Sequence, residues 1–270
     1  MNKPFLKWAG SKRSSIDMLK EEIDVVKDRF IEPFVGSAVV SLNVDAKEYL
    51  LADINSDLIN LFINLKEYGE DFIKDCKKLF SSRYNNSENF YDLRNRFNII
   101  EDVYEKSTIF LYLNRHAFNG LCRYNSSGKF NVPFGKYKNP YFPEKEMLFF
   151  YKKSYKFKFL NSDFEKTIRN CKRKTDVFYC DPPYVPLSKT ASFTDYNAGG
   201  FTQDQQLKLA KFGENSKNLF LISNHDTDFT REIYKNADKF RFKEINRYIS
   251  ARVDGRKSVN EILAIYNPLI

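Results

Sequence analysis

The sequence predicts an α/β protein in which an open, mostly parallel sheet is interrupted by a mostly helical insertion that carries a β-hairpin. Two observations support this fold class. Short apolar runs near both ends of the chain each stop at a glycine or a polar residue, as buried parallel strands do beside a ligand crevice. Between these runs, residues 57–108 show the apolar spacing of helices.

The first unit is predicted to be strand, turn, helix and strand. Residues 29–35 form an apolar run that ends at Gly36, and residues 38–42 resemble a short helix. Residues 49–52 then form a second buried strand, with Asp53 at its carboxyl end. In dinucleotide-binding folds, an acid at this place accepts hydrogen bonds from ribose hydroxyls.

Two more apolar runs of the same kind lie late in the chain. Residues 177–180 stop at Asp181, and residues 219–223 stop at Asn224. After them, residues 240–249 and 261–266 look like a closing antiparallel pair.

The middle of the chain differs from both ends. Leu58, Leu61, Phe62 and Leu65 fall on one face of a helix, and residues 125–129 have the turn chemistry of a hairpin. We therefore divide the chain into an outer domain, residues 1–56 and 145–270, and an inserted domain, residues 57–144.

The charge indicates a polyanionic partner. The net charge is +9, and residues 106–138 hold six basic residues and no acidic one, interleaved with aromatic side chains. Residues 235–257 hold eight basic residues against three acidic ones. Such segments suit nucleic acid, where phosphates and bases are bound together.

Other classes of protein are not indicated. No apolar run is long enough for a transmembrane helix, and the first residues lack a signal-peptide pattern, so we expect a cytoplasmic protein. The four cysteines form no CxxC pair and are expected to be buried thiols. His116 and His225 belong to no HxE or PCxxC pattern, which excludes a zinc deaminase, and we expect no metal.

Asp181-Pro182-Pro183-Tyr184 directly follows a predicted strand and is the main candidate for catalysis. A strand end of this composition can be an ordinary turn. Here, however, the two prolines restrict the backbone and fix two acceptors, the Asp181 carboxylate and the Pro182 carbonyl. Two fixed acceptors can hold both N–H groups of an exocyclic amine such as that of adenine, while Tyr184 offers an aromatic face for the base.

Eight segments, in the same order along the chain, together resemble the Dam family of DNA adenine-N6 methyltransferases. They are Lys7–Lys12, Glu32–Gly36, Ala52–Asp57, Asn114-Arg115, Asn119–Asn125, Asn131–Gly135, Asp181–Tyr184 and Ser223–Asp226. The resemblance implies a Rossmann-like S-adenosylmethionine methyltransferase sheet with an inserted DNA-recognition domain. It also implies methyl transfer from S-adenosylmethionine to adenine N6 in double-stranded DNA, within the sequence GATC. This activity would be associated with the nucleoid. The target base would be flipped out, and the methyl group would pass directly and in line.

The resemblance assigns residues to the cofactor and to the reaction. The cofactor would be lined by Trp8, Ala9, Gly10, Lys12, Phe34, Gly36, Asp53, Asp163, Phe164 and Asp181. Catalysis would rest on Asp181, Pro182 and Tyr184. The family pattern FxGxG is broken here, because Ala38 stands in place of the second glycine.

The resemblance also assigns DNA contacts. Base edges would be approached by Lys7, Leu121, Arg123, Pro133 and Tyr137, with Arg123 on a guanine. Phe118 and Asn119 would enter the base stack, although Phe118 replaces the tyrosine of close relatives. Phosphates would be contacted by Arg115, Asn125, Asn131 and Lys136.

Alternatives remain open at this point. A relative with another recognition sequence, such as GATATC, would share the chemistry. A nicotinamide-dependent oxidoreductase would explain Asp53 but lacks a GxGxxG turn. A DNA-binding module without activity would explain only the charge. The oligomeric state is open, and the reaction requires no second protein.

Overall fold

The computed structural model describes residues 1–23, 26, 28–186, 200–246 and 258–267. Within them, seven strands form one sheet in the order β3-β2-β1-β4-β5-β7-β6. The strands are β1 (Arg29–Glu32), β2 (Glu48–Asp53), β3 (Phe157–Asn161), β4 (Asp176–Cys180), β5 (Phe220–His225), β6 (Lys239–Asn246) and β7 (Ser258–Tyr266). Strands β1 to β5 pair in parallel, whereas β7 is antiparallel to both β5 and β6. This is the Rossmann-like α/β sheet that the sequence predicts.

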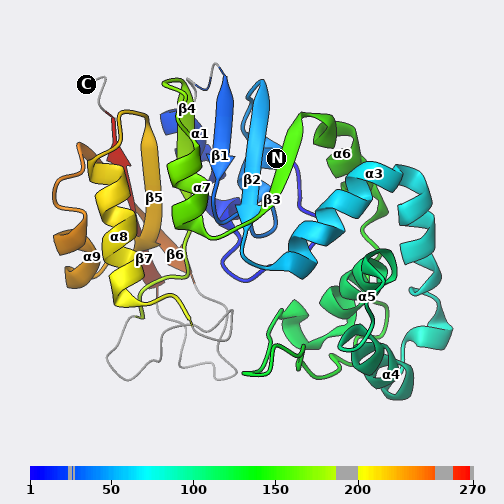
Figure 1. Cartoon of the computed structure of the whole chain (residues 1–270). Coiled ribbons are helices and arrows are strands. Elements are labelled where there is room, and N and C mark those ends of the chain that lie inside the picture. Colours follow the sequence, from blue (N-terminus) through cyan, green and yellow to red (C-terminus); the bar gives the residue numbers. More distant parts are fainter. Residues whose placement is uncertain (24–25, 27, 187–199, 247–257, 268–270) are drawn as a thin grey trace.

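The helices cover the sheet and extend beyond one edge of it. They are α1 (Ile16–Ile23), α2 (Val39–Asn43), α3 (Ser56–Lys78), α4 (Ser87–Phe97), α5 (Val103–His116), α6 (Glu144–Lys153), α7 (Phe164–Asn170), α8 (Gln203–Glu214) and α9 (Asp228–Ile233). Helices α7 and α8 lie across one face of the sheet, while α4 and α5 lie beyond β3 (Figure 1). None of the helices that the structure describes is long and apolar enough to cross a membrane.

The position of the candidate site follows from the strand order. The chain runs from β1 to β2 on one side, and later from β3 to β4 on the other side of β1. Ligand crevices form where the strand order reverses in this way, at the carboxyl ends of the two neighbouring strands. The segments that follow β1 and β4, residues 33–36 and 181–184, therefore start at the same edge of the sheet.

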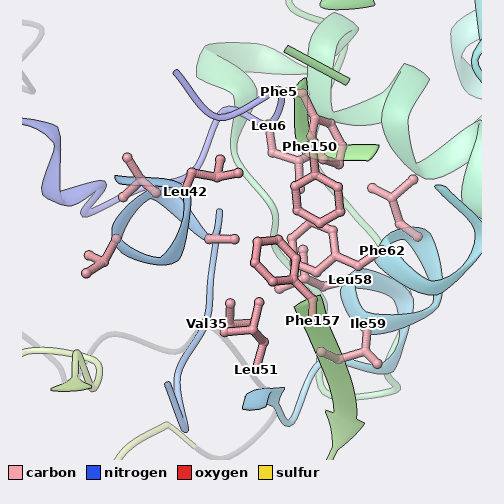
Figure 2. Close-up of a cluster of buried hydrophobic side chains, with 14 of the residues drawn as sticks. Phe5, Leu6, Val35, Leu42, Leu51, Leu58, Ile59, Phe62, Phe150 and Phe157 are labelled. Atoms are coloured by element: carbon pink, nitrogen blue, oxygen red, sulfur yellow. The ribbon is translucent and has the colours of Figure 1, made fainter. Parts of the chain in front are cut away.

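Aromatic packing joins the sheet to the insertion. Phe62 of α3 stacks on Phe150 of α6 with ring centroids 4.9 Å apart, and Phe5 meets both rings edge-on (Figure 2). Burial of one such side chain contributes about 2–3 kcal/mol. One apolar core continues from Phe157 of the sheet to Phe110 of α5.

A kink divides α3 between these two surroundings. Gly69 has φ 51° and ψ −120°, a conformation that only glycine adopts easily, and the ring of Tyr151 fills the space beside it. Residues before the kink, such as Phe62, pack toward the sheet, whereas Phe72 after it packs on Tyr104 of α5. The domain boundary at residue 57 stays a prediction. The shared core shows that the first half of α3 packs against both the outer and the inserted domain.

Most predicted elements are confirmed. The runs at 29–35, 49–52, 177–180 and 219–223 all contain strands, and residues 57–108 are mainly helical. Residues 240–246 and 261–266 pair antiparallel; residues 247–249, with the basic segment 247–257, lie outside the described residues. The turn at 125–129 is present, but it is flanked by isolated bridges, Tyr124 with Phe130 and Ala117 with Phe134, instead of regular strands.

Candidate functional site

Lys12 brings two of the predicted motifs together, Lys7–Lys12 and Asp181–Tyr184. Its ammonium group lies 3.1 Å from Oδ1 of Asp181, which directly follows β4. It also donates to the Gly10 carbonyl at 2.7 Å and lies 4.5 Å from the centre of the Tyr184 ring. The Lys12 side chain is only 4% exposed, so this charge is fixed beside the carboxylate.

The Asp181 carboxylate retains unused capacity to accept hydrogen bonds. Burial raises the pKa of Asp181, and the nearby Lys12 ammonium opposes this rise. Apart from the ion pair of Asp181 Oδ1 with Lys12, neither this atom nor the Tyr184 hydroxyl has a hydrogen bond of good geometry among the described residues. Buried polar groups are nearly always satisfied, so these two atoms point to a ligand or substrate that completes them.

The turn after β1 packs closely against the Trp8 side chain and leaves no room for a Cβ atom at Gly36. Gly36 has φ 47°, and a Cβ atom there would lie 2.9 Å from Nε1 of Trp8. Its N–H donates to Oδ2 of Asp53 at 3.2 Å, while Oδ1 of Asp53 accepts from the N–H of Asn55 at 3.0 Å. Burial raises the pKa of Asp53, and these backbone N–H groups favour its charged form. Gly36, Trp8 and Asp53 are thus neighbours at the carboxyl ends of β1 and β2.

The predicted aromatic neighbours of the cofactor, Phe34 and Phe164, follow β1 and β3. The rings of Phe34 and Phe164 stack at 5.4 Å, and Phe201 packs edge-on against Phe34 at 5.5 Å. Asp163 caps α7 by accepting from the N–H of Glu165 at 2.8 Å. The preceding residue, Ser162, donates its N–H to the Asp53 carbonyl, which connects this segment with the end of β2.

The insertion presents a compact surface built around its hairpin turn. Oδ1 of Asn125 accepts from the N–H groups of Ser127 and Lys129, which closes the turn. Nε of Arg123 donates to Oδ1 of Asn131 at 2.8 Å across the base of the hairpin. The hydroxyl of Tyr124 donates to Asp57 at 2.7 Å and so ties the hairpin to the start of α3.

The segment Lys7–Lys12 connects this surface with the loop of residues 181–184. The backbone N–H and carbonyl of Lys7 pair with the Asn114 side chain at 2.9 and 2.7 Å, and the Lys7 ammonium lies 4.2 Å from the centre of the Tyr137 ring. Its side chain also packs against Gly120, where φ is 62°. The Lys7–Lys12 segment therefore contacts the insertion through Lys7 and Asp181 through Lys12.

Ten of the eleven predicted DNA-contact residues are exposed or half-buried. They are Lys7, Phe118, Asn119, Leu121, Arg123, Asn125, Asn131, Pro133, Lys136 and Tyr137. Phe118 is 50% exposed although it is a large apolar side chain, as an inserting wedge requires. Asn119 and Lys136 have φ of 53° and 54° in the turns around them.

Arg115 requires a correction. The sequence suggests a phosphate contact, but this side chain is buried and its guanidinium donates to the Phe5 carbonyl. Its charge also lies 5.5 Å from the centre of the Tyr141 ring. Arg115 therefore fastens the N-terminal segment to α5, and it is not presented to a phosphate.

Sequence reasoning missed three polar residues near the loop. Glu32, at the end of β1, is fully buried, and burial raises its pKa to about 8. Gln206 of α8 and Asn224 of β5 are also fully buried and bond to residues 183 and 185. Glu32 and Asn224 belong to two of the eight family segments, but the sequence did not indicate a role for either side chain. Gln206 had no sequence signal.

No cluster of three or more metal-ligating side chains occurs in the part of the chain that the structure describes.

Comparison with known proteins agrees with this geometry. The family model described as "D12 class N6 adenine-specific DNA methyltransferase" matches residues 8–250. The DNA adenine methylase of Serratia marcescens is 46% identical over 98% of this chain and 98% of its own length. Those of Haemophilus influenzae and Escherichia coli K12 are 47% and 43% identical, over 98% and 99% of this chain and 94% and 96% of their own lengths.

Proposed function

The chain belongs to the D12 class of N6 adenine-specific DNA methyltransferases, and on this premise we propose how its residues perform the reaction. The methyl donor is S-adenosylmethionine, the substrate is double-stranded DNA, and the recognised sequence is GATC. The observation that carries the proposal is the meeting of Lys12, Asp181 and Tyr184 at the sheet's switch point. The family membership also excludes the oxidoreductase and the DNA-binding module without activity.

The residues at the strand ends fit S-adenosylmethionine. The Asp53 carboxylate accepts from ribose hydroxyls, and Gly36 allows the backbone to approach the ligand closely. The stacked rings of Phe34 and Phe164, with Asp163 beside them, suit a flat adenine moiety. Trp8, Ala9, Gly10 and Lys12 enclose the side toward Asp181. When bound, this cofactor supplies an electrophilic methyl group on a sulfonium.

Asp181 and Pro182 align the substrate amine. The lone pair of adenine N6 is delocalised into the ring, so the amine is a poor nucleophile. When the Asp181 carboxylate and the Pro182 carbonyl accept both N–H groups, the nitrogen becomes pyramidal and its lone pair points at the methyl group. Because burial raises the pKa of Asp181, this carboxylate also accepts the proton more readily as or after the C–N bond forms.

The insertion delivers the base to this loop. Adenine N6 cannot reach Asp181 from within a duplex, so the nucleotide is flipped out, and the face of Tyr184 stacks on it. Phe118 and Asn119, both exposed, fill the space that the base leaves. Lys7 contacts the insertion and Lys12 contacts Asp181, so the segment Lys7–Lys12 links the DNA-contact surface of the insertion to the loop of residues 181–184.

GATC recognition rests on Arg123 and its neighbours. Asn131 holds the Nε atom of Arg123, which orients the remaining guanidinium nitrogens for a bidentate contact to guanine. Leu121 and Pro133 offer apolar contact to a thymine methyl group. Asn125, Asn131 and Lys136 lie on the same hairpin and suit phosphates beside the site.

Replacing Asp181 tests the catalytic assignment. Asp181→Asn keeps the shape of the side chain but removes the charged acceptor, so kcat should fall by about a hundredfold or more while DNA and S-adenosylmethionine still bind. Transfer of labelled methyl groups to a duplex measures kcat, and calorimetry measures both affinities. Asp228→Asn, at an exposed position on α9, is the control. Unchanged methylation by Asp181→Asn would remove Asp181 from the reaction.

Expression in cells that lack adenine methylation tests the recognition sequence. Their DNA should become resistant to an endonuclease that methylated GATC blocks. Complete digestion would contradict the GATC assignment but not the chemistry, because another target such as GATATC would still carry N6-methyladenine. Sequencing the modified positions then identifies that target.

A further inference from the structure

The backbone of the catalytic loop is held from outside by side chains. Pro182 and Pro183 have no N–H groups, so the loop can form few backbone hydrogen bonds of its own. Gln206 Nε2 donates to the Pro183 carbonyl at 2.8 Å. The N–H of Val185 donates to Oδ1 of Asn224 at 3.0 Å, and Nδ1 of His225 lies 2.6 Å from the Val185 carbonyl.

These side chains are also bonded to one another. Nδ2 of Asn224 donates to Oε1 of Gln206 at 3.0 Å and lies 3.0 Å from the Tyr234 hydroxyl. Gln206, Asn224 and Tyr234 are 0% exposed, and His225 is 5% exposed. A buried network in which each amide uses both its donor and its acceptor is rigid, because any shift leaves a group unsatisfied.

Acceptors at residues 181 and 182 face no such clamp from the described part of the chain. Among the described residues, none donates a hydrogen bond to the Pro182 carbonyl. Asp181 Oδ1 and the Tyr184 hydroxyl also lack aligned partners there. The network thus bonds residues 183 and 185 while the acceptors needed by the amine stay available.

We propose that Gln206, with Asn224 and His225, forms a backbone clamp that sets the direction of the Asp181 and Pro182 acceptors toward the target amine. Gln206 is a positioning residue, since it acts through Pro183 and touches no substrate. The inference rests on the proposed catalytic role of residues 181–184. Because near-attack geometry is sensitive to small displacements, loosening the clamp lowers the rate of the aligned step and leaves binding almost unchanged.

A matched pair of variants on one helix tests the clamp. Gln206→Met removes the donor to Pro183 with little change in size. Gln205→Met, the control, removes the side-chain acceptor for the Thr202 N–H in the capping box of α8 and leaves the loop contacts intact. Both should lower thermal stability, by about 1 kcal/mol for the lost cap. Only Gln206→Met should lower kcat, by about tenfold or more, with KM for DNA and S-adenosylmethionine within about threefold.

Gln206→Glu is the second variant, for the case that Gln206→Met does not fold. It preserves the volume and the acceptor for Asn224. A protonated carboxyl can still donate to the Pro183 carbonyl, whereas an ionised one cannot, so kcat of this variant should fall relative to the original protein as the pH rises. If both Gln206 variants keep kcat at the level of Gln205→Met, or change only KM, the clamp has no positioning role. If Asp181→Asn stays active, the proposed function fails; if Asp181→Asn is inactive and the Gln206 variants are normal, only this inference fails.

Discussion

Ala38 adopts a left-handed backbone conformation, with φ 59° and ψ 20°, at a fully buried position. The resemblance indicates glycine at this place, and the structure shows the reason. A residue with a Cβ atom pays about 1–2 kcal/mol to adopt this conformation. Position 38 of the turn after β1 therefore keeps a backbone conformation typical of glycine although its residue is alanine.

We predict that Ala38→Gly is nearly neutral for stability. The loss of a buried methyl group and the larger entropy of the unfolded chain each cost about 1 kcal/mol. Relief of the backbone strain offsets the sum of these two costs. Ala210, equally buried but inside α8, is the matched control: Ala210→Gly should cost about 2 kcal/mol. Urea denaturation of both variants measures this difference. Equal losses would show that Ala38 carries no strain.

The sequence predicted the residues of the site better than their supports. Asp53 ends β2 and Asp181 follows β4, so the rule that ligands lie at the carboxyl ends of parallel strands was sufficient to place both at the same edge of the sheet. Arg115 was assigned wrongly because its motif cannot show which way a helical side chain faces, and here it faces the core. Gln206 was missed because its contact with Pro183 arises only when α8 packs beside the loop.

At the scale of elements, the junction of β1 and α2 depends on a buried acid. Oε2 of Glu32 accepts from the N–H of Ser41 at 3.0 Å and also from its hydroxyl, so this carboxyl ties the strand to the helix. Burial raises the pKa of Glu32 from 4.5 to about 8, and the charge of Asp181 adds to the rise. Glu32 is therefore protonated in the folded protein at neutral pH.

This shift predicts a pH-dependent loss of stability. Between about pH 4.5 and 8 the unfolded chain releases the Glu32 proton and the folded protein retains it, so rising pH favours unfolding. In Glu32→Gln, the side-chain amide resembles the neutral carboxyl in shape but does not titrate. The stability of this variant relative to the original protein should increase from pH 5 to pH 8 and then level off. Denaturation at several pH values measures the difference. A constant difference would contradict the burial argument, and Glu70→Gln, at an exposed position, is the control.

The elements themselves were predicted unevenly, for a physical reason. Strand β4 is buried at every residue, and its residues from Val177 to Cys180 form an unbroken apolar run, which the sequence shows directly. Strand β3 lies at the edge of the sheet, is buried only at Phe157 and contains Lys158, so its pattern resembles a loop. The hairpin was correctly located by its turn residues, but its strands are reduced to single bridges because it packs by side chains.

At the scale of the molecule, three of the predicted DNA-contact cations lie on neighbouring segments. Lys7, Arg123 and Lys136 belong to segments that meet around Gly120 and the hairpin. Elsewhere, many basic side chains are paired with acids, such as Lys78 with Asp75 and Arg231 with Asp226. Among the described residues, Lys7, Arg123 and Lys136 belong to no such ion pair, so their charges stay available to DNA.

We predict that DNA binding weakens steeply with salt, because bound phosphates release counterions. Lys136→Ala should reduce the slope of log affinity against log salt by about one and weaken all duplexes equally. Arg123→Ala should instead cost about 1–3 kcal/mol of discrimination at one guanine and leave other sequences similar. Fluorescence anisotropy at several salt concentrations, on duplexes with and without GATC, separates these effects, with Lys78→Ala as control. A flat salt response would show that the insertion is not the phosphate surface. Uniform weakening of all duplexes by Arg123→Ala would show that Arg123 does not read a base.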